Sequence, residues 1–155
     1  MEMPKPTAEH RQLHRLAGEF AGEETMLPSP WGPGGKATGR YSCRVDIDGM
    51  FLLQDYVQEK EGRVSYRGHG VFGYDPQRAC VTWYWVDSFG MPPAAPSRGN
   101  WDGDTIRFEH EPQGDQRGRY TYAFQGDDRF TFTIENSHDG GKTWSTFMEA
   151  HYERV

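Results

Sequence analysis

The stretch GHGVFGYDPQRACVTWYWVDS (residues 68–88) has the pattern that decides the fold. In its second half, Val81, Trp83 and Trp85 are spaced two apart, so they share one face of an extended chain. An Asp75-Pro76 turn signal precedes them, and the residues before that turn repeat the same period. The stretch therefore predicts a hairpin of two strands, each with one face toward a core.

The same two-residue period continues in both directions from this hairpin. Turn pairs such as Asp48-Gly49, Asp102-Gly103 and Gly126-Asp127 separate the apolar runs at regular intervals. They predict ten strands, at about residues 19–27, 36–47, 50–59, 63–74, 79–88, 97–101, 104–111, 118–125, 129–136 and 143–153. Evenly spaced strands with no second helix indicate an antiparallel up-and-down barrel or a sandwich.

One helix is predicted, at residues 7–17, before the first strand. Thr7 is a suitable cap, and Leu13 and Leu16 fall on one face. If the strands pair in sequence order, the tight turns lie at one end of a barrel together with this helix, which plugs that end. The longer loops, 28–35 and 89–96 among them, then frame the other end. We therefore expect a cup with room for one small ligand.

Length and composition favour a single domain over residues 1–155, with the barrel at 19–153. Aromatic residues reach 14%, which suits strand faces and cavity walls. A net charge of -6 without a basic run argues against nucleic acid as a partner, and no stretch approaches the length of a membrane span. Cys43 and Cys80 are far apart in sequence and are expected to be buried and reduced, as in a cytoplasmic protein.

Four segments in order resemble a bacterial family, domain of unknown function 1579: LAGEF (16–20), GHGVFGYDP (68–76), WVDS (85–88) and MEAHYERV (148–155). The resemblance covers almost the whole chain, although Phe20 stands where the family usually has tryptophan. It implies a calycin-like barrel, similar to lipocalins and fatty-acid-binding proteins. Because the family has no assigned activity, the resemblance implies no functional residue.

Alternation also predicts which residues face the interior. Gly68 and Gly70 are inward positions without side chains, so they leave space or let another backbone approach closely, unless the surrounding rings fill that space. Three ionisable residues, Asp55, Asp87 and His110, fall on apolar faces near the mouth, as rim residues or as polar anchors for a ligand. Asp55 shares its predicted inward face with Phe51, Leu53 and Val57. The predicted apolar wall consists of Trp83, Trp85, Phe108, Tyr122, Phe132 and Met148. Other predicted inward residues are Val64, Tyr66, Phe72, Val81, Ile106, Tyr120, Phe124, Phe130, Ile134, Trp144, Ala150 and Tyr152.

Binding of a small apolar molecule is the leading functional hypothesis. In a second hypothesis, Asp87 and His110 form a general acid/base pair for an isomerisation or cyclisation, which requires the two side chains to meet. In a third, side chains fill the interior and the outer face forms a homodimer. No metal or other cofactor is predicted, because the His10 and His14 pair lacks a third ligand and His151 alternates out of phase with the inward residues.

The segment SHDGGKTW (137–144) resembles the Asp-box of sialidase propellers. A propeller needs several such boxes, and this chain has one, between two strong strands. Asp139 is placed to accept backbone N–H bonds, and the Gly140-Gly141 pair permits positive φ. The segment is therefore predicted to be the turn joining the last two strands, on the rim of the cup.

Overall fold

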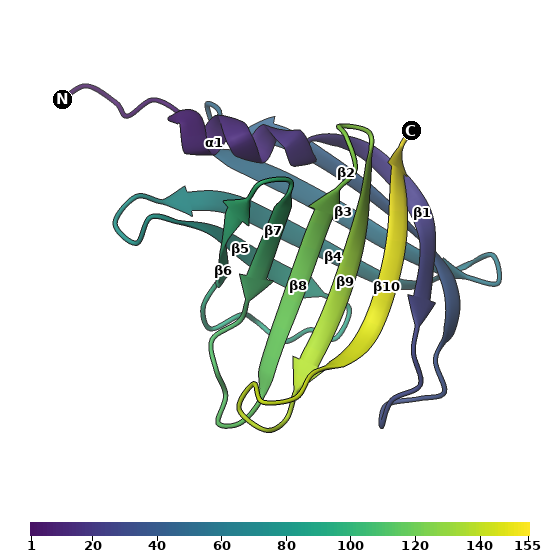
Figure 1. The fold of residues 1–155 in the computed structure, drawn as a ribbon. Coiled ribbons are helices and arrows are strands. Elements are labelled where there is room, and N and C mark those ends of the chain that lie inside the picture. Colours follow the sequence, from purple (N-terminus) through teal and green to yellow (C-terminus); the bar gives the residue numbers. More distant parts are fainter.

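The computed structural model describes residues 1–155, and ten antiparallel strands close into a barrel (Figure 1). Each strand pairs with its neighbours in sequence, and the first strand closes the barrel against the last. The strands are β1 (Gly18–Met26), β2 (Gly35–Asp46), β3 (Phe51–Lys60), β4 (Arg63–Asp75), β5 (Cys80–Asp87), β6 (Ser97–Asp102), β7 (Thr105–Glu109), β8 (Arg117–Phe124), β9 (Arg129–Ser137) and β10 (Ser145–Arg154). The predicted up-and-down barrel is confirmed.

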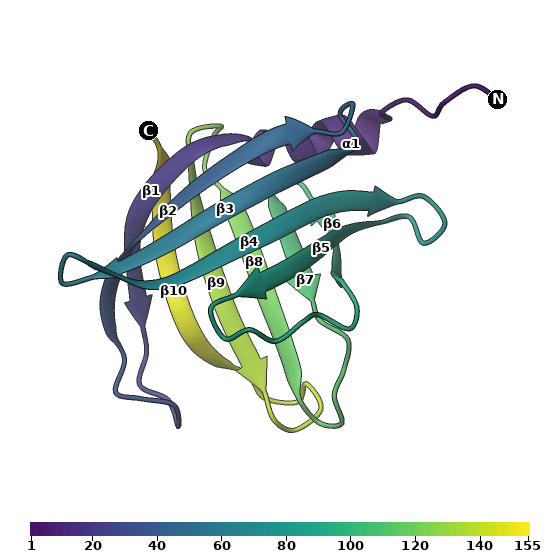
Figure 2. The same ribbon diagram turned by 180° about the vertical axis from the view of Figure 1, so that it is seen from behind.

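A short helix, α1 (Ala8–Leu13), and a following 3-10 turn, η1 (His14–Leu16), lie across one end of the barrel (Figures 1 and 2). Leu13 and Leu16 point into the barrel and are almost fully buried. Arg15 holds this segment to two turns at the same end, bonding the Asp104 carboxylate at 2.8 Å and the Gly126 carbonyl at 3.0 Å. No helix is long and apolar enough to cross a membrane.

Aromatic side chains fill the interior beneath the helix. The rings of Phe72 and Trp83 stack with centroids 5.4 Å apart, and Tyr122 and Phe132 meet edge to face at 4.7 Å. Phe72, Phe108 and Tyr122 are at most 1% exposed. These contacts account for the high aromatic content, because offset and edge-to-face ring pairs stabilise a core beyond the area they bury.

The interior face of β3 differs from the prediction. Leu52, Gln54 and Tyr56 face inward and are buried, whereas Phe51 and Asp55 face outward and are exposed. Both faces of this strand carry apolar residues, so alternation did not distinguish them. Gln54 is accommodated inside because its Oε1 accepts a hydrogen bond from the indole of the facing tryptophan, Trp83, at 3.2 Å.

Two register shifts move predicted inward residues to the surface. One lies between Thr146 and Met148 on β10, and Trp144, beyond it, faces outward over the Arg119 guanidinium at 3.9 Å. The other lies where β3 meets the start of β4, and Val64 there is 46% exposed. A bulge reverses the alternation on its far side, so a constant two-residue period fails beyond it.

Candidate functional site

A cavity of about 690 Å³ lies inside the barrel, lined in part by the β1–β2 loop and the connection after β5, and no residue of α1 lines it. Fourteen of its 24 lining residues are hydrophobic, so its wall is mainly apolar. The loop between β1 and β2 forms one side of the mouth and places Trp31, 68% exposed, at its edge. Trp31 also packs edge to face on Phe147, with ring centroids 6.0 Å apart. The long loops predicted for this end therefore frame a real hollow.

The barrel wall is incomplete beside the cavity because β5 extends beyond β6. Trp83 pairs with Ser97, and no later residue of β5 pairs with β6. Trp85 and Asp87 pair with β4 alone. The connection after β5 continues this open edge and presents Phe89, 81% exposed, to the cavity. Beyond Trp83 the cavity wall is therefore formed by β5 and the connection that follows it, without pairing to β6.

Gly68 and Gly70 create room for tryptophan rings. A Cβ at Gly68 would overlap the Trp85 ring, and one at Gly70 would overlap the Trp83 indole nitrogen and the Gln54 amide. In the β4–β5 register, Gly70 pairs with Trp85, and Gly68 pairs with Asp87, two residues further along β5. Of the predicted roles, packing of rings is the one that the structure shows. Neither glycine lines the cavity.

Asp87 is a cavity residue, held by three neutral donors. Its Oδ2 accepts hydrogen bonds from the Tyr66 hydroxyl at 2.6 Å and the Trp85 indole at 2.9 Å, and its Oδ1 accepts the Phe89 amide at 2.9 Å. Burial and the bond to Asp87 raise the pKa of Tyr66 well above its usual range. The tyrosine therefore stays protonated and remains a donor to this carboxylate.

A second interior carboxylate, Glu24, was not predicted. It is fully buried and accepts hydrogen bonds from the hydroxyls of Tyr56, at 2.5 Å, and Tyr152, and from the Gln58 amide at 3.0 Å. Burial and then the nearby Glu24 charge raise the pKa of both tyrosines. Gly39 on β2 pairs with Gly22, and a Cβ at Gly39 would overlap the Glu24 carboxylate. Glu24 is separated by an even number of residues from Phe20 and from Met26, which are both buried. The two-residue period of the strand therefore indicates that Glu24 faces inward.

The predicted ligand-contacting residues divide into three groups. The first group lines the cavity and consists of Trp83, Trp85, Asp87, Phe132 and Met148. The second group lies in the interior without lining the cavity and consists of Phe108, Tyr122, Gly68 and Gly70. The third group, Asp55 and His110, lies outside the barrel cavity.

Asp55 lies on the outer face of β3, which corrects the prediction that it faces the interior. Its carboxylate pairs with His69 at 2.9 Å and with Arg44 at 3.8 Å, and its side chain is 59% exposed. The error follows from the ambiguous alternation of β3. Asp55 is therefore an outer-face residue and not a polar anchor in the cavity.

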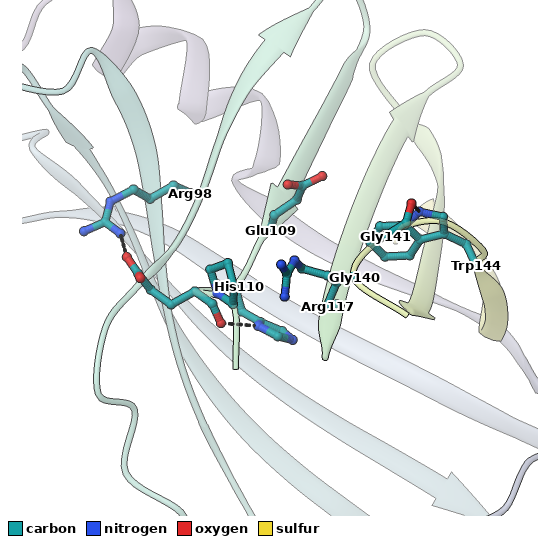
Figure 3. Close-up of a pocket in the computed structure, with 10 residues that line it drawn as sticks. Arg98, Glu109, His110, Arg117, Gly140, Gly141 and Trp144 are labelled. Carbon is teal, nitrogen blue, oxygen red and sulfur yellow. Dashed lines mark hydrogen bonds and ion pairs between the residues drawn. The ribbon is translucent and has the colours of Figure 1, made fainter. Parts of the chain in front are cut away.

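His110 lies just beyond β7 in a separate outer groove of about 430 Å³ (Figure 3). We call the outer groove the hollow lined by Arg98, Glu109, His110, Glu111, Pro112, Arg117, Gly118, Gly140, Gly141 and Trp144. The imidazole packs over Gly118, and its Nδ1 lies 2.7 Å from the Glu111 carbonyl. No hydrogen bond joins it to Asp87, which lines the cavity instead. The predicted acid/base pair is therefore not formed.

The outer groove is mostly polar, with one hydrophobic residue among ten. Arg98 bonds the Glu111 carboxylate at 2.8 Å (Figure 3). Arg117 bonds the Gly114 carbonyl at 2.5 Å, so both cations have partners within the protein. The barrel cavity is larger and more apolar than the outer groove, which makes it the better candidate site. Nowhere do three or more His, Cys, Asp or Glu side chains gather as metal ligands would.

The SHDGGKTW segment is the β9–β10 turn, as predicted. The Asp139 carboxylate accepts bonds from the Ser137 hydroxyl at 2.8 Å and from the Thr143 amide at 2.9 Å. His138 in this turn lies 6.2 Å, ring to ring, from Trp31 at the cavity mouth. The turn therefore stands on the rim of the cup, next to the β1–β2 loop.

Comparisons with known proteins agree with this architecture. No curated protein matches the chain. The crystal structure of Rv2717c from M. tuberculosis is similar, with a TM-score of 0.70 at 14% identity over 96% of this chain and 98% of that one. The S-type phycobiliprotein lyase CPES from Guillardia theta gives 0.67 at 11% identity over 97% and 98%. At these identities the likeness shows the shared fold alone.

The family comparison covers nearly the whole chain. A family model described as "Protein of unknown function (DUF1579)" matches residues 5–154, in agreement with the four segments recognised in the sequence. The chain therefore belongs to the DUF1579 family.

Proposed function

We propose that this protein binds a small, largely apolar molecule inside the barrel. The cavity carries the proposal: its volume of about 690 Å³ falls in the range of small-molecule sites, and its wall is mainly hydrophobic with a few polar groups. A barrel packed solid would leave no such space. The free, buried cysteines Cys43 and Cys80 are consistent with a reducing compartment, so we place the protein in the cytoplasm.

The ligand's body would contact the rings and thioether that line the cavity. Trp83 and Trp85 come from β5, Phe132 from β9 and Met148 from β10, so the wall surrounds a bound molecule on more than one side. Such side chains give affinity through buried apolar area, about 25 cal/mol per Å². Trp31 and Phe89 at the mouth extend the apolar surface toward solvent.

The experiment is a fluorescence titration with the neutral apolar probe N-phenyl-1-naphthylamine. We expect saturable binding with increased emission, because the probe leaves water for an apolar site. A Ser97→Phe substitution places a ring in the cavity and should reduce the affinity at least about tenfold. Ser145→Phe adds the same ring at an exposed position of β10 outside the cavity and should leave binding unchanged.

Absence of saturable binding by the unmodified protein would contradict the proposal. Equal loss of binding in Ser97→Phe and Ser145→Phe would place the probe elsewhere. Circular dichroism of each variant shows whether the barrel is intact. If Ser97→Phe does not fold, Asn136→Phe provides a second substitution at a residue that lines the cavity.

A further inference from the structure

The cavity wall carries a negative charge without a positive partner inside the protein. None of the ten ion pairs includes Asp87 or Glu24. Lys60, at the exposed end of β3, is the one lysine or arginine among the lining residues. A carboxylate in an apolar hollow is costly unless it is paired or hydrogen-bonded, and Asp87 has neutral donors only.

Asp87 retains capacity for another donor. A carboxylate offers about four lone-pair positions. Oδ2 uses two, for the Tyr66 hydroxyl and the Trp85 indole, and Oδ1 uses one, for the Phe89 amide. One position on Oδ1 therefore has no protein donor. Because Asp87 lines the cavity and is only partly buried, a donor on a bound molecule can reach this carboxylate.

Aromatic rings surround this carboxylate. Tyr66 lies 5.8 Å from Phe89 and 5.9 Å from Tyr56, centroid to centroid, and Tyr56 lies 5.9 Å from Trp85. All four residues line the cavity together with Asp87 and Tyr120. The faces of such rings attract cations, and ring clusters of this kind recognise ammonium groups. The rings and the carboxylate favour the same class of ligand group.

We propose that the molecule bound in the cavity is an organic cation, in which an ammonium group lies against Asp87 and the surrounding rings and an apolar body fills the space toward Phe132 and Met148. This inference rests on the proposed function and specifies its ligand. An anionic ligand such as a fatty acid is disfavoured, because its carboxylate would share the cavity with Asp87, and Glu24 lies directly behind Tyr56.

The test uses three probes of equal length: 4-phenylbutylamine, 4-phenylbutanol and 4-phenylbutanoate. Each is titrated to displace N-phenyl-1-naphthylamine from the protein at neutral pH. We expect the amine to bind about tenfold more tightly than the alcohol, and the carboxylate to bind most weakly. In Asp87→Asn the amine should lose its advantage over the alcohol, with both affinities measured by displacement of the naphthylamine from the same variant.

Asp102→Asn is the matched control, since Asp102 is exposed and lies outside the cavity, in the β6–β7 hairpin. It removes the same charge and should preserve the preference for the amine. An amine that binds no better than the alcohol, or a preference that persists in Asp87→Asn, would overturn the inference while leaving the proposed function in place. Failure of the naphthylamine itself to bind would overturn the proposed function first. If Asp87→Asn does not fold, the relative affinities of the three probes for the unmodified protein test the inference.

Discussion

At the residue scale, interior glycines determine where the large side chains lie. Gly68 leaves room for the Trp85 ring, and Gly39 leaves room for the Glu24 carboxylate. In each case a missing side chain on one strand allows a bulky or charged group on a neighbouring strand to fit inside the barrel. Such pairs of a glycine and a large side chain cannot be predicted from alternation. Alternation predicts which face of a strand a residue occupies, but not which residue of the neighbouring strand lies beside it.

The change Gly68→Ala should destabilise the protein. Its Cβ would come about 2.0 Å from the Trp85 ring, and overpacking of this kind costs about 1–3 kcal/mol. Chemical denaturation followed by tryptophan fluorescence measures the free energy of unfolding. Gly32→Ala, where nothing lies within 4 Å of the new Cβ, is the control and should change that free energy by less than about 0.5 kcal/mol. Equal effects of the two substitutions would show that Gly68 does not make room for the ring.

The Asp139 carboxyl should titrate at unusually low pH. Bonds from the Thr143 side chain and amide, and from the Ser137 hydroxyl, lower its pKa to about 2. Because the folded pKa lies below the unfolded value of about 4, the ionised form stabilises the turn. That stabilisation is fully present above about pH 4 and is lost as the pH falls toward 2. An NMR titration of the side-chain carbon should give a midpoint near 2, and a midpoint near 4 would contradict the hydrogen bonding described here.

Individual site residues were predicted unevenly from sequence. Trp83, Trp85 and Asp87 line the cavity, because strong alternation in VTWYWVDS leaves only one face for two tryptophans, and their contact with a ligand stays a prediction. Asp55 was placed on the wrong face, since β3 is apolar on both sides. Glu24 was missed because a buried carboxylate depends on donors from β3 and β10, which are distant in sequence.

At the scale of the elements, period and turn residues predicted all ten strands and their order. The register within two hairpins was not predictable. An extra residue at the β10 bulge moves Trp144 outside, where it packs on Arg119. A bulge that has no glycine cannot be recognised reliably from the residue types alone. The prediction therefore assumed a constant two-residue period across both bulges.

The helical segment should contribute to stability by closing the barrel end. Leu13→Ala removes a side chain that is 2% exposed in the core and should cost about 2–5 kcal/mol in the free energy of unfolding. Gln12→Ala, on the exposed side of α1, should cost less than about 0.5 kcal/mol. Urea denaturation of both variants gives the comparison. A loss below about 1 kcal/mol for Leu13→Ala would indicate that α1 is only loosely attached to the barrel.

At the scale of the whole molecule, the barrel has a packed half and a hollow half. Side chains such as Phe72, Phe108 and Tyr122 fill the part beneath the helix, whereas the part beneath the long loops remains open. Sequence parity predicted which end would be open. Parity did not predict whether the interior would be filled, because that depends on summed side-chain volumes and on where strand pairing ends, as between β5 and β6.

The five tryptophans allow a direct test of where a ligand binds. Trp83 and Trp85 line the cavity, Trp31 stands at its mouth, Trp144 lines the outer groove, and Trp101 packs on Phe124 and Arg15 near the plugged end. Each indole N–H gives a separate signal in a proton–nitrogen NMR spectrum of labelled protein. The measurement is a titration of these signals with N-phenyl-1-naphthylamine. Binding in the cavity predicts large shifts for Trp83 and Trp85 with Trp144 and Trp101 unchanged, whereas shifts at Trp144 with Trp83 and Trp85 unmoved would contradict it.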